Sequence, residues 1–452
     1  MMVKKKIVNC VVLVVAVILL AGCGSASDSE SKEVAIEVAV TCADFIATGA
    51  SAAEQSKCQA ELGKLLFHDK SLSRDRSQSC ATCHNPDKGF IDDRINDASG
   101  NTAHGLAASA GSLGDNQVAI GDRNAPTAAY AAFSPEFKQG TRTRVQSQQT
   151  SGISDYEGFL GGQFWDGREA DLAGQAGGPP LNPGEMNMPS KAAVVERIKE
   201  NTDYVKNFER LYGAAIFADV DAAYSAMTDS IAAFETFDKK TFYPFDSKYD
   251  RSLNADYEYS PAAKASLGKA RFFSSDLTCA ACHQLRAIDS KGEIFSSFEY
   301  HNLGVPENTH LRAFNDAQGP DEGLLNNPNV TSLLQRGKFK VPTLRNIAVT
   351  APYMHNGIFN ELETVILFYQ HAKEKALHSK NGSAISAINN PETGLPWGDA
   401  EIDSNIEQGL LGASDIDLDS DEVEAMVCFL ISLTDARYEH LLDPLKVADC
   451  GL

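Results

Sequence analysis

Two stretches decide the fold of this chain: Cys80-Ala81-Thr82-Cys83-His84 and Cys279-Ala280-Ala281-Cys282-His283. Both match Cys-x-x-Cys-His, the pattern to which a c-type haem is covalently attached. Two thiols on one helical turn can reach both vinyl groups of a haem, and the next histidine then lies beneath the iron as its proximal ligand. A redox dithiol or half of a zinc site is the competing interpretation, but neither copy has a second Cys-x-x-Cys nearby to complete a zinc site. The sequence therefore predicts two covalently bound haem c groups.

The segments before the two motifs resemble each other. Leu62-Gly63-Lys64-Leu65-Leu66-Phe67 precedes the first motif, and Leu267-Gly268-Lys269-Ala270-Arg271-Phe272 precedes the second. This weak internal repeat is consistent with a duplicated unit, and a chain of 452 residues exceeds one ordinary domain. We predict a mainly α fold of two cytochrome-c-like haem domains, residues 41–245 and 246–452, with long irregular loops.

Helices are predicted where apolar residues recur at helical spacing. Two of them lead into the haem motifs, over 59–67 and 261–273, and the others cover 191–212, 222–237, 361–371 and 423–433. The acidic residues at 419–422 suit the first turn of the last helix, where the helix dipole favours negative charge. The glycine- and proline-rich stretches 100–126 and 151–190 are candidate site-forming loops.

The N-terminus is predicted to be an export signal. Three lysines at 4–6 precede an apolar run from Val11 to Leu20, which is too short to span a bilayer. Leu20-Ala21-Gly22-Cys23 resembles a lipobox, in which the cysteine is lipidated. We therefore expect a signal peptide over 1–22, a flexible tether over 23–40, and a periplasmic protein held by a lipid anchor, with the outer membrane favoured over the inner. An ordinary signal peptide with a chance cysteine is the alternative.

Four cysteines lie outside the signal, the lipobox and the haem motifs: Cys42, Cys58, Cys428 and Cys450. An even remainder in an oxidising compartment suggests disulfides. Proximity in the sequence favours the pairs Cys42–Cys58 and Cys428–Cys450, and four buried free thiols are the alternative.

The formal net charge of −21 restricts the partners. Nucleic acid is not expected, because phosphate binding requires clustered lysine and arginine. A basic, diffusing protein would be attracted. We expect membrane contact through the lipid anchor only, and a homodimer stays open.

Beyond the haem motifs, three segments carry a more specific resemblance: 121–127, 164–186 and 339–357. The second segment begins Phe164-Trp165-Asp166-Gly167-Arg168, and the third contains Pro352-Tyr353-Met354-His355-Asn356-Gly357. Together they resemble the signature of bacterial di-haem cytochrome c peroxidases and their MauG-like relatives, over roughly 45–440. The resemblance implies that peroxide is reduced at the N-terminal haem, held by His84, with electrons passed through the C-terminal haem, held by His283.

The resemblance also implies roles for three further side chains. Glu185 and Gln175 would lie in the distal pocket of the N-terminal haem. A carboxylate there can take a proton from one peroxide oxygen and return it to the other, whereas an amide can only orient the substrate. Trp165 resembles a tryptophan that relays electrons between the haems. The alternatives are a surface glutamate in a loop and a tryptophan that serves the core.

Metal ligands implied by the resemblance include one calcium site and two axial haem positions. Asn124, Thr350 and Pro352 resemble a calcium site built from hard oxygen ligands, although Asn124 could equally belong to a turn. His104 lies where classical members carry a second ligand of the N-terminal iron, with an exposed loop histidine as the alternative. Tyr369 stands fourteen residues after His355, where high-potential peroxidases have methionine and MauG-like enzymes have tyrosine.

Tyr369 would lower the potential of the C-terminal haem, because tyrosinate is a hard anionic ligand that favours the ferric state. His371 as the ligand, or Tyr369 as plain core, stays open. The chain also departs from MauG, since Leu277 stands where MauG has a tryptophan two residues before the second motif. This departure puts MauG's route of electrons to a protein substrate in doubt.

The predicted function is a di-haem peroxidase that reduces hydrogen peroxide with electrons from a small donor protein such as a cytochrome c or cupredoxin. One alternative is a MauG-like enzyme that uses peroxide to oxidise a protein or small molecule. The other is a non-catalytic electron-transfer lipoprotein, against which Glu185 and Gln175 argue, because a carrier needs no acid–base group above an iron.

Overall fold

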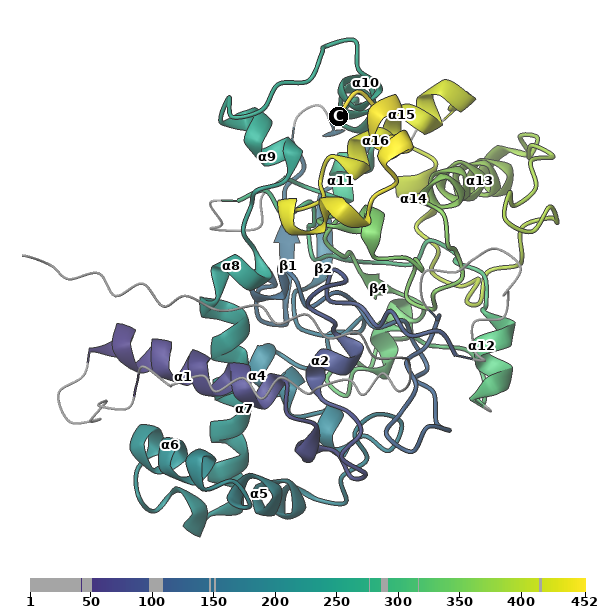
Figure 1. Cartoon of the computed structure of the whole chain (residues 1–452). Coiled ribbons are helices and arrows are strands. Elements are labelled where there is room, and N and C mark those ends of the chain that lie inside the picture. The colour runs from purple at the N-terminus through teal and green to yellow at the C-terminus, as the bar shows by residue number, and fades with distance from the viewer. Residues whose placement is uncertain are drawn as a thin grey trace, which may run out of the picture. The chain divides into compact units, whose positions relative to one another are not determined.

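The structure is a computed structural model that describes residues 42, 51–96, 109–145, 148–149, 152–275, 277–285, 292–315, 317–413 and 417–452. Helices dominate the described residues, as predicted (Figure 1). Residues 44–452 form one compact unit, so the boundary proposed at 245/246 stays a prediction. The α-helices are α1 Ala52–Phe67, α2 Cys80–Cys83, α4 Leu172–Ala176, α5 Lys191–Lys199, α6 Thr202–Tyr212, α7 Val220–Phe237, α8 Lys239–Phe242, α9 Lys248–Leu253, α10 Lys264–Phe272, α11 Cys279–Cys282, α12 Thr309–Phe314, α13 Leu362–Asn381, α14 Gln408–Leu411, α15 Ser420–Ile431 and α16 Pro444–Asp449.

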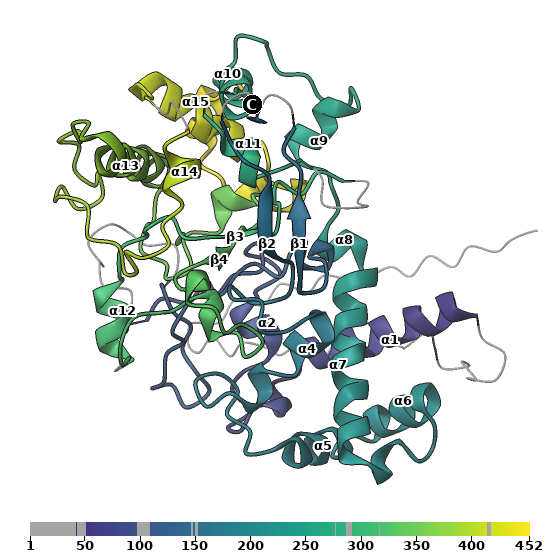
Figure 2. The same cartoon turned by 180° about the vertical axis from the view of Figure 1, so that it is seen from behind.

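The described β structure consists of two small antiparallel ladders. Strand β1 (Lys138–Arg142) pairs with β2 (Tyr156–Leu160), and β3 (Tyr300–His301) pairs with β4 (Phe339–Lys340). An isolated bridge between Leu160 and Glu299 connects the end of β2 to the start of β3. Figure 2 shows both ladders from behind, between the helices of the N-terminal half and those of the C-terminal half. The ladders therefore join the two halves.

In the N-terminal half, α1 crosses α7 at a glycine. A Cβ atom at Gly63 would lie 1.8 Å from the carbonyl oxygen of Ser230, so only glycine permits this approach. The Ser51 and Glu54 side chains form a capping box that begins α1. At the end of α1, Phe67 packs edge-to-face on Phe234 of α7, with ring centroids 5.6 Å apart. This helix pair places the first haem motif, α2, on the scaffold.

The C-terminal half repeats this crossing. Helix α10 packs on α15, and a Cβ atom at Gly268 would lie 1.8 Å from the carbonyl oxygen of Ala425. Helix α15 begins at a capping box between Asp419 and Glu422, which confirms the predicted acidic first turn. The sequence repeat is therefore a structural repeat, with glycine at the same point of both crossings.

The predicted single helix over 191–212 is wrong in one respect. The structure ends α5 at Lys199 and begins α6 at Thr202. The side chain of Asn201 accepts hydrogen bonds from the backbone N–H groups of Asp203 and Tyr204, so this residue acts as the N-cap of a new helix. Apolar spacing continues across the break and did not reveal it.

The predicted disulfide between Cys428 and Cys450 is present, with a Cα–Cα distance of 5.2 Å. It ties α15 to the segment after α16. Cys42 and Cys58 are also disulfide-bonded, which argues against free thiols at these four positions.

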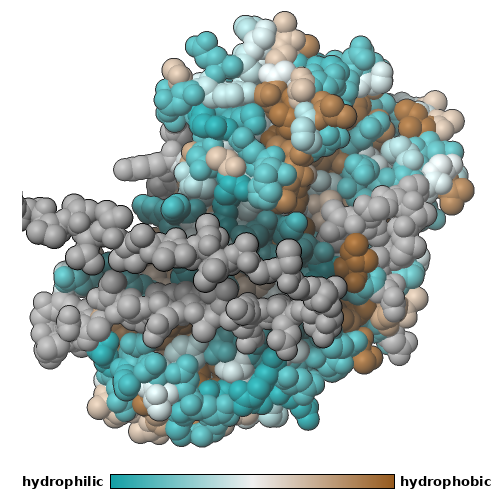
Figure 3. All heavy atoms as spheres, in the orientation of Figure 1, coloured by the Kyte–Doolittle hydropathy of each residue, from teal (hydrophilic) through white to brown (hydrophobic). Residues whose placement is uncertain are grey.

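The described surface is mostly hydrophilic on the face in Figure 3, with a band of apolar side chains in the upper half of the view. Among the described residues, no helix has both the length and the apolar character needed to cross a bilayer.

Candidate functional site

The first haem motif presents its histidine in the state that an iron requires. His84 Nδ1 donates to the carbonyl oxygen of Phe90 at 3.2 Å, which leaves Nε2 available as a ligand. Burial lowers the pKa of His84, so the ring is neutral. Cys80 and Cys83, on the preceding turn of α2, carry free thiols. These three residues fit a covalently attached haem.

The second motif has the same arrangement. His283 Nδ1 donates to the carbonyl oxygen of Phe295 at 3.0 Å. Burial lowers the pKa of His283 to about 4, so this ring is neutral as well. Cys279 and Cys282 again carry free thiols on the short helix α11. The residues of the second motif therefore also fit a haem.

For each motif, a threonine donates to the backbone carbonyl of the residue just before the histidine's acceptor. The sequence analysis did not predict either of these two hydrogen bonds. Thr127 Oγ1 donates to the carbonyl oxygen of Gly89 at 2.6 Å, one residue before Phe90. Thr343 Oγ1 donates to that of Ile294, also at 2.6 Å and one residue before Phe295. Both threonines follow a proline, in Pro126-Thr127 and Pro342-Thr343. The repeated Pro-Thr dipeptide is the sequence signal from which these two hydrogen bonds could have been predicted.

A cavity of about 320 Å³ lies against the second motif. Cys279, Cys282, His283 and Tyr369 all line it. Tyr369 comes from α13, and burial, with the thiols of Cys282 and Cys279, raises its pKa. The structure thus brings Tyr369 to the haem pocket where the count from His355 predicted it. The remaining wall is largely apolar, and includes Phe272, Leu277, Leu362, Val365, Ile366, Leu411, Met426 and Leu430.

Glu185, by contrast, acts electrostatically on the two cysteines of the first motif. Burial, followed by nearby carboxylates that include Glu185, raises the pKa of the Cys80 and Cys83 thiols to about 12. Glu185 is thus one of several charged groups whose field reaches both attachment points. Burial raises the pKa of Glu185 itself, although Arg168 and a hydrogen bond from Asn182 oppose the shift. A partly buried carboxyl with a raised pKa is the kind of group that acid–base chemistry requires, and its place in the distal pocket stays a prediction.

Two other groups occur near the first motif. Gln175 lies on α4, which packs against α7, and its role in the distal pocket stays a prediction. Glu235 on α7 was not predicted from the sequence, and its side chain is 4% exposed. After burial, its charge contributes most to the raised pKa of the Cys80 thiol. Burial raises the pKa of Glu235 to about 8.

Trp165 lines the same cavity as the second motif. Its indole Nε1–H donates to the carbonyl oxygen of Asn124 at 2.9 Å, and its own carbonyl oxygen accepts from the backbone N–H of Lys340 at 2.9 Å. Ile91, which follows the Phe90 acceptor of the first motif, also lines this cavity. Trp165 therefore shares a cavity with the second motif and with Ile91, and its role as a relay stays a prediction.

The three residues of the predicted calcium site all line the cavity beside the second motif, and the site itself stays a prediction. Asn124, Thr350 and Pro352 line one cavity, and the backbone N–H of Asn124 donates to the carbonyl oxygen of His355 at 2.8 Å. Side-chain and carbonyl oxygens form a donor set of the kind that calcium prefers. His104 lies outside the described residues.

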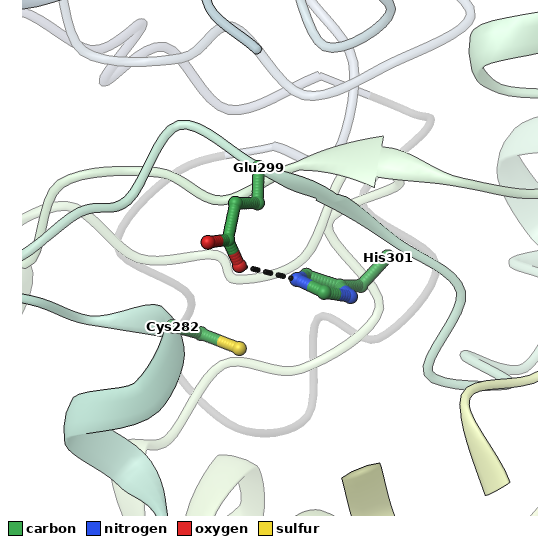
Figure 4. Close-up of side chains that lie close together, drawn as sticks. All are labelled: Cys282, Glu299 and His301. Atoms are coloured by element: carbon green, nitrogen blue, oxygen red, sulfur yellow. Dashed lines mark hydrogen bonds and ion pairs between the residues drawn. The ribbon is translucent and has the colours of Figure 1, made fainter. Parts of the chain in front are cut away.

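Behind Cys282 lies a buried charged cluster that the sequence did not reveal (Figure 4). Glu299 accepts from His301 Nε2 at 3.0 Å and forms a bidentate ion pair with Arg144, at 2.9 and 2.8 Å. Arg144 also donates to the carbonyl oxygen of Ala281 at 2.8 Å. Cys282, Glu299 and His301 are close enough to hold a metal ion, but the Cys282 thiol is used by haem attachment. The cluster instead fixes α11 to the ladder β3–β4.

Comparison with known proteins agrees with this geometry. The sequence profile of the family described as di-haem cytochrome c peroxidase matches residues 57–258. The methylamine utilization protein MauG of Paracoccus denitrificans is 40% identical over 406 residues, which cover 88% of this chain and 95% of that protein. The cytochrome c peroxidase Ccp of Escherichia coli is 30% identical over 79% of this chain and 69% of that protein.

A solved structure shows the same fold. It is a variant of the diheme peroxidase BthA from Burkholderia thailandensis in which a tyrosine is replaced by methionine. The two chains are 25% identical with a TM-score of 0.67, over 86% of this chain and 88% of that one. The family profile includes the first haem motif, and the matches to MauG and to BthA cover 88% and 86% of this chain, in agreement with the resemblance in the sequence. The chain therefore belongs to the di-haem cytochrome c peroxidase family and carries two c-type haems.

Proposed function

We propose that this chain reduces hydrogen peroxide at the haem held by Cys80, Cys83 and His84, with Glu185 as the acid–base group. The observation that supports the proposal is the partly buried Glu185 carboxyl, whose own pKa burial raises and whose charge raises the pKa of both thiols of the first motif. The second motif faces Tyr369 and an apolar wall instead.

The reaction consumes one hydrogen peroxide, two electrons and two protons and produces two waters. When bound, the haem supplies an iron that accepts a peroxide oxygen and exchanges electrons. Glu185 takes the proton from the oxygen nearest the iron and delivers it to the departing oxygen, which leaves as water. Gln175 orients the peroxide, and Arg168 holds positive charge beside Glu185.

Electrons reach this site from the C-terminal half. In the proposal Trp165 relays them; it lines the cavity beside the second motif together with Ile91, and its indole donates to the Asn124 carbonyl. Calcium at Asn124, Thr350 and Pro352 would hold the same segment in place. His104 is a further candidate ligand of the N-terminal iron.

The setting of the reaction is also part of the proposal. The donor is a small redox protein such as a cytochrome c or cupredoxin, attracted by the acidic surface. The enzyme acts in the periplasm, held by a lipid on Cys23, with the outer membrane favoured, and a homodimer is the assembly to test for.

One observation favours a second candidate function. Tyr369 lines the C-terminal haem pocket, and a tyrosinate ligand lowers the iron potential, which disfavours storing an electron there. A MauG-like oxidation of a protein or small molecule by peroxide would suit such a haem. The 40% identity to MauG of Paracoccus denitrificans supports this alternative.

Steady-state peroxide consumption with reduced cytochrome c tests the two functions. Catalytic oxidation of cytochrome c that requires peroxide is expected for a peroxidase. Peroxide consumption without turnover of any small donor would favour the MauG-like alternative, and no reaction in a protein with both haems would contradict the proposal.

A further inference from the structure

We propose that Trp397 is the relay through which an external donor passes electrons to the C-terminal haem. The inference rests on the proposed function, in which that haem receives electrons from outside the protein. It concerns a surface residue that neither the haem motifs nor the peroxide site includes.

An uninterrupted set of aromatic rings connects the C-terminal haem pocket with Trp397. Tyr369 lines the pocket together with Cys282 and His283. The ring of Phe368, its neighbour on α13, has its centroid 6.2 Å from that of Tyr369 and 5.9 Å from that of Trp397. Phe368 is 2% exposed, so water does not interrupt this contact. Electron exchange between the pocket and Trp397 therefore crosses packed aromatic rings only.

The indole of Trp397 is held in one orientation. Phe359 meets it edge-to-face at 5.8 Å, and His371 stacks on it at 5.4 Å with planes 19° apart. Its Nε1–H donates to the carbonyl oxygen of Ile388 at 2.9 Å. Packing against fixed rings restricts the geometry of the indole, which keeps its contact with Phe368 constant.

Trp397 also reaches the surface. It is partly exposed, and the segment before it exposes large aliphatic side chains at Ile385, Ile388 and Leu395, which are 40%, 44% and 64% exposed. Apolar groups around a fixed indole provide a place where a donor can approach closely. Trp165, the other tryptophan of the chain, lines the cavity beside the second motif instead.

The position two residues before the second motif offers no such route. Leu277, two residues before Cys279, is fully buried and aliphatic, so it cannot donate an electron. Trp397 is therefore the indole that connects the C-terminal pocket with solvent in the part of the chain that the structure describes.

The electron balance is simple. After hydrogen peroxide has withdrawn electrons from the haem pair, the indole gives one electron to the C-terminal haem and keeps its proton, because the Ile388 carbonyl that accepts the N–H bond is not a base. A reduced donor returns one electron to the indole and is itself oxidised. Two such transfers supply the two electrons that one hydrogen peroxide takes up with two protons.

The test compares Trp397→Phe with the wild type in stopped-flow mixing. The control is Phe314→Leu, which alters another exposed aromatic ring that lies beside a histidine, His310, on α12. The spectral change caused by peroxide should be equal in all three proteins. The later return to the resting spectrum with reduced cytochrome c should slow by about tenfold or more in Trp397→Phe, equivalent to about 1.4 kcal/mol in the barrier, and Trp397→Tyr, which keeps an oxidisable ring, should recover part of that rate.

A second readout needs no variant. Wild-type protein treated with peroxide and no donor should gain oxygen at Trp397, as peptide mass spectrometry measures. An unslowed return in Trp397→Phe, or an unmodified Trp397 beside other oxidised residues, overturns the inference. A wild type that shows no spectral change with peroxide contradicts the proposed function itself, so the two failures are distinguishable.

Discussion

The N-terminal and C-terminal haem halves share their proximal side and differ on the distal side. In both, a helix crosses its partner at a glycine, Gly63 or Gly268. In both, a histidine donates Nδ1–H to a phenylalanine carbonyl, and a threonine supports the preceding carbonyl. On the distal side, the proposal gives the first half the Glu185 carboxyl and the second half Tyr369, which lines a largely apolar cavity.

This difference teaches how one duplicated scaffold holds two haems for two purposes. Attachment and proximal ligation depend on short segments that were duplicated together. In the proposed function, acid–base chemistry and the potential of the second iron depend on a residue from elsewhere in the chain, Glu185 of the loop 177–190 in one half and Tyr369 of α13 in the other. Substitutions can test the shared proximal side and the differing distal side separately.

The largest effect is expected from Glu185→Gln. The variant should bind both haems and lose about 100-fold or more of its rate of peroxide cleavage, because the amide cannot transfer the proton. Single-turnover mixing with peroxide measures this rate, and Glu157→Gln, at an exposed position on β2, is the control. An unchanged rate in a folded variant would remove Glu185 from the mechanism.

The rate should also depend on pH in the wild type. Glu185 must be ionised to accept the first proton, and burial raises its pKa above 4.5. The rate of peroxide cleavage should therefore fall as pH falls, with a midpoint above that of an ordinary glutamate. The Gln variant should lack this dependence, and a wild-type rate that is flat through this range would contradict the role.

Tyr369→Met should have the next largest effect, confined to the other half. Replacing an anionic oxygen ligand by methionine should raise the potential of the C-terminal haem by on the order of 100 mV or more. The wild type should lack the methionine-to-iron charge-transfer band of His/Met cytochromes c, and the variant should gain it. A wild type with that band would make Met354, beside His355, the first ligand to examine.

The two helix crossings should respond alike to Gly63→Ala and Gly268→Ala. Each new Cβ would lie 1.8 Å from a backbone carbonyl oxygen, so the helices must separate, at a cost of about 1–3 kcal/mol in the free energy of unfolding. Denaturant unfolding of the haem-loaded proteins measures the loss. Gly409→Ala on α14 meets no atom within 4 Å and is the control. A loss in one half only would show that the crossings are not equivalent.

The smallest effects should come from Thr127→Val and Thr343→Val. Each removes one hydrogen bond of 2.6 Å to a carbonyl, which is worth about 1 kcal/mol. The iron–histidine vibration, read by resonance Raman spectroscopy, should shift only in the haem of the altered half. Thr143→Val, at an exposed position, should leave both vibrations unchanged, and unshifted vibrations in both threonine variants would reduce these residues to ordinary loop contacts.

Sequence predicted well what depends on neighbouring residues. The haem motifs, the capped start of α15 and the glycine of each repeated helix are local signals, and each is present in the structure. The break between α5 and α6 escaped because Asn201 forms a cap without interrupting the apolar spacing. The acceptor of each proximal histidine also escaped, since it follows its histidine by six residues in one half and by twelve in the other, at Phe90 and Phe295.

Distal contacts were accessible only through resemblance. Glu185 follows His84 by about a hundred residues, and nothing in its immediate sequence shows that it returns to Cys80. The ion pair between Arg144 and Glu299 joins two loops without a common motif. Trp397 is a lone tryptophan in a loop until α13 places Phe368 between it and Tyr369. Such contacts follow from the tertiary fold.

Electron paramagnetic resonance of the oxidised protein with added azide tests the division between the halves most directly. Azide is a small anion that should enter the distal site beside Glu185 but should not displace Tyr369. The account predicts that azide changes only one of the two ferric signals, that Glu185→Gln perturbs this same signal, and that Tyr369→Phe perturbs only the other. Azide binding at the Tyr369-dependent haem, or at both haems equally, would contradict it.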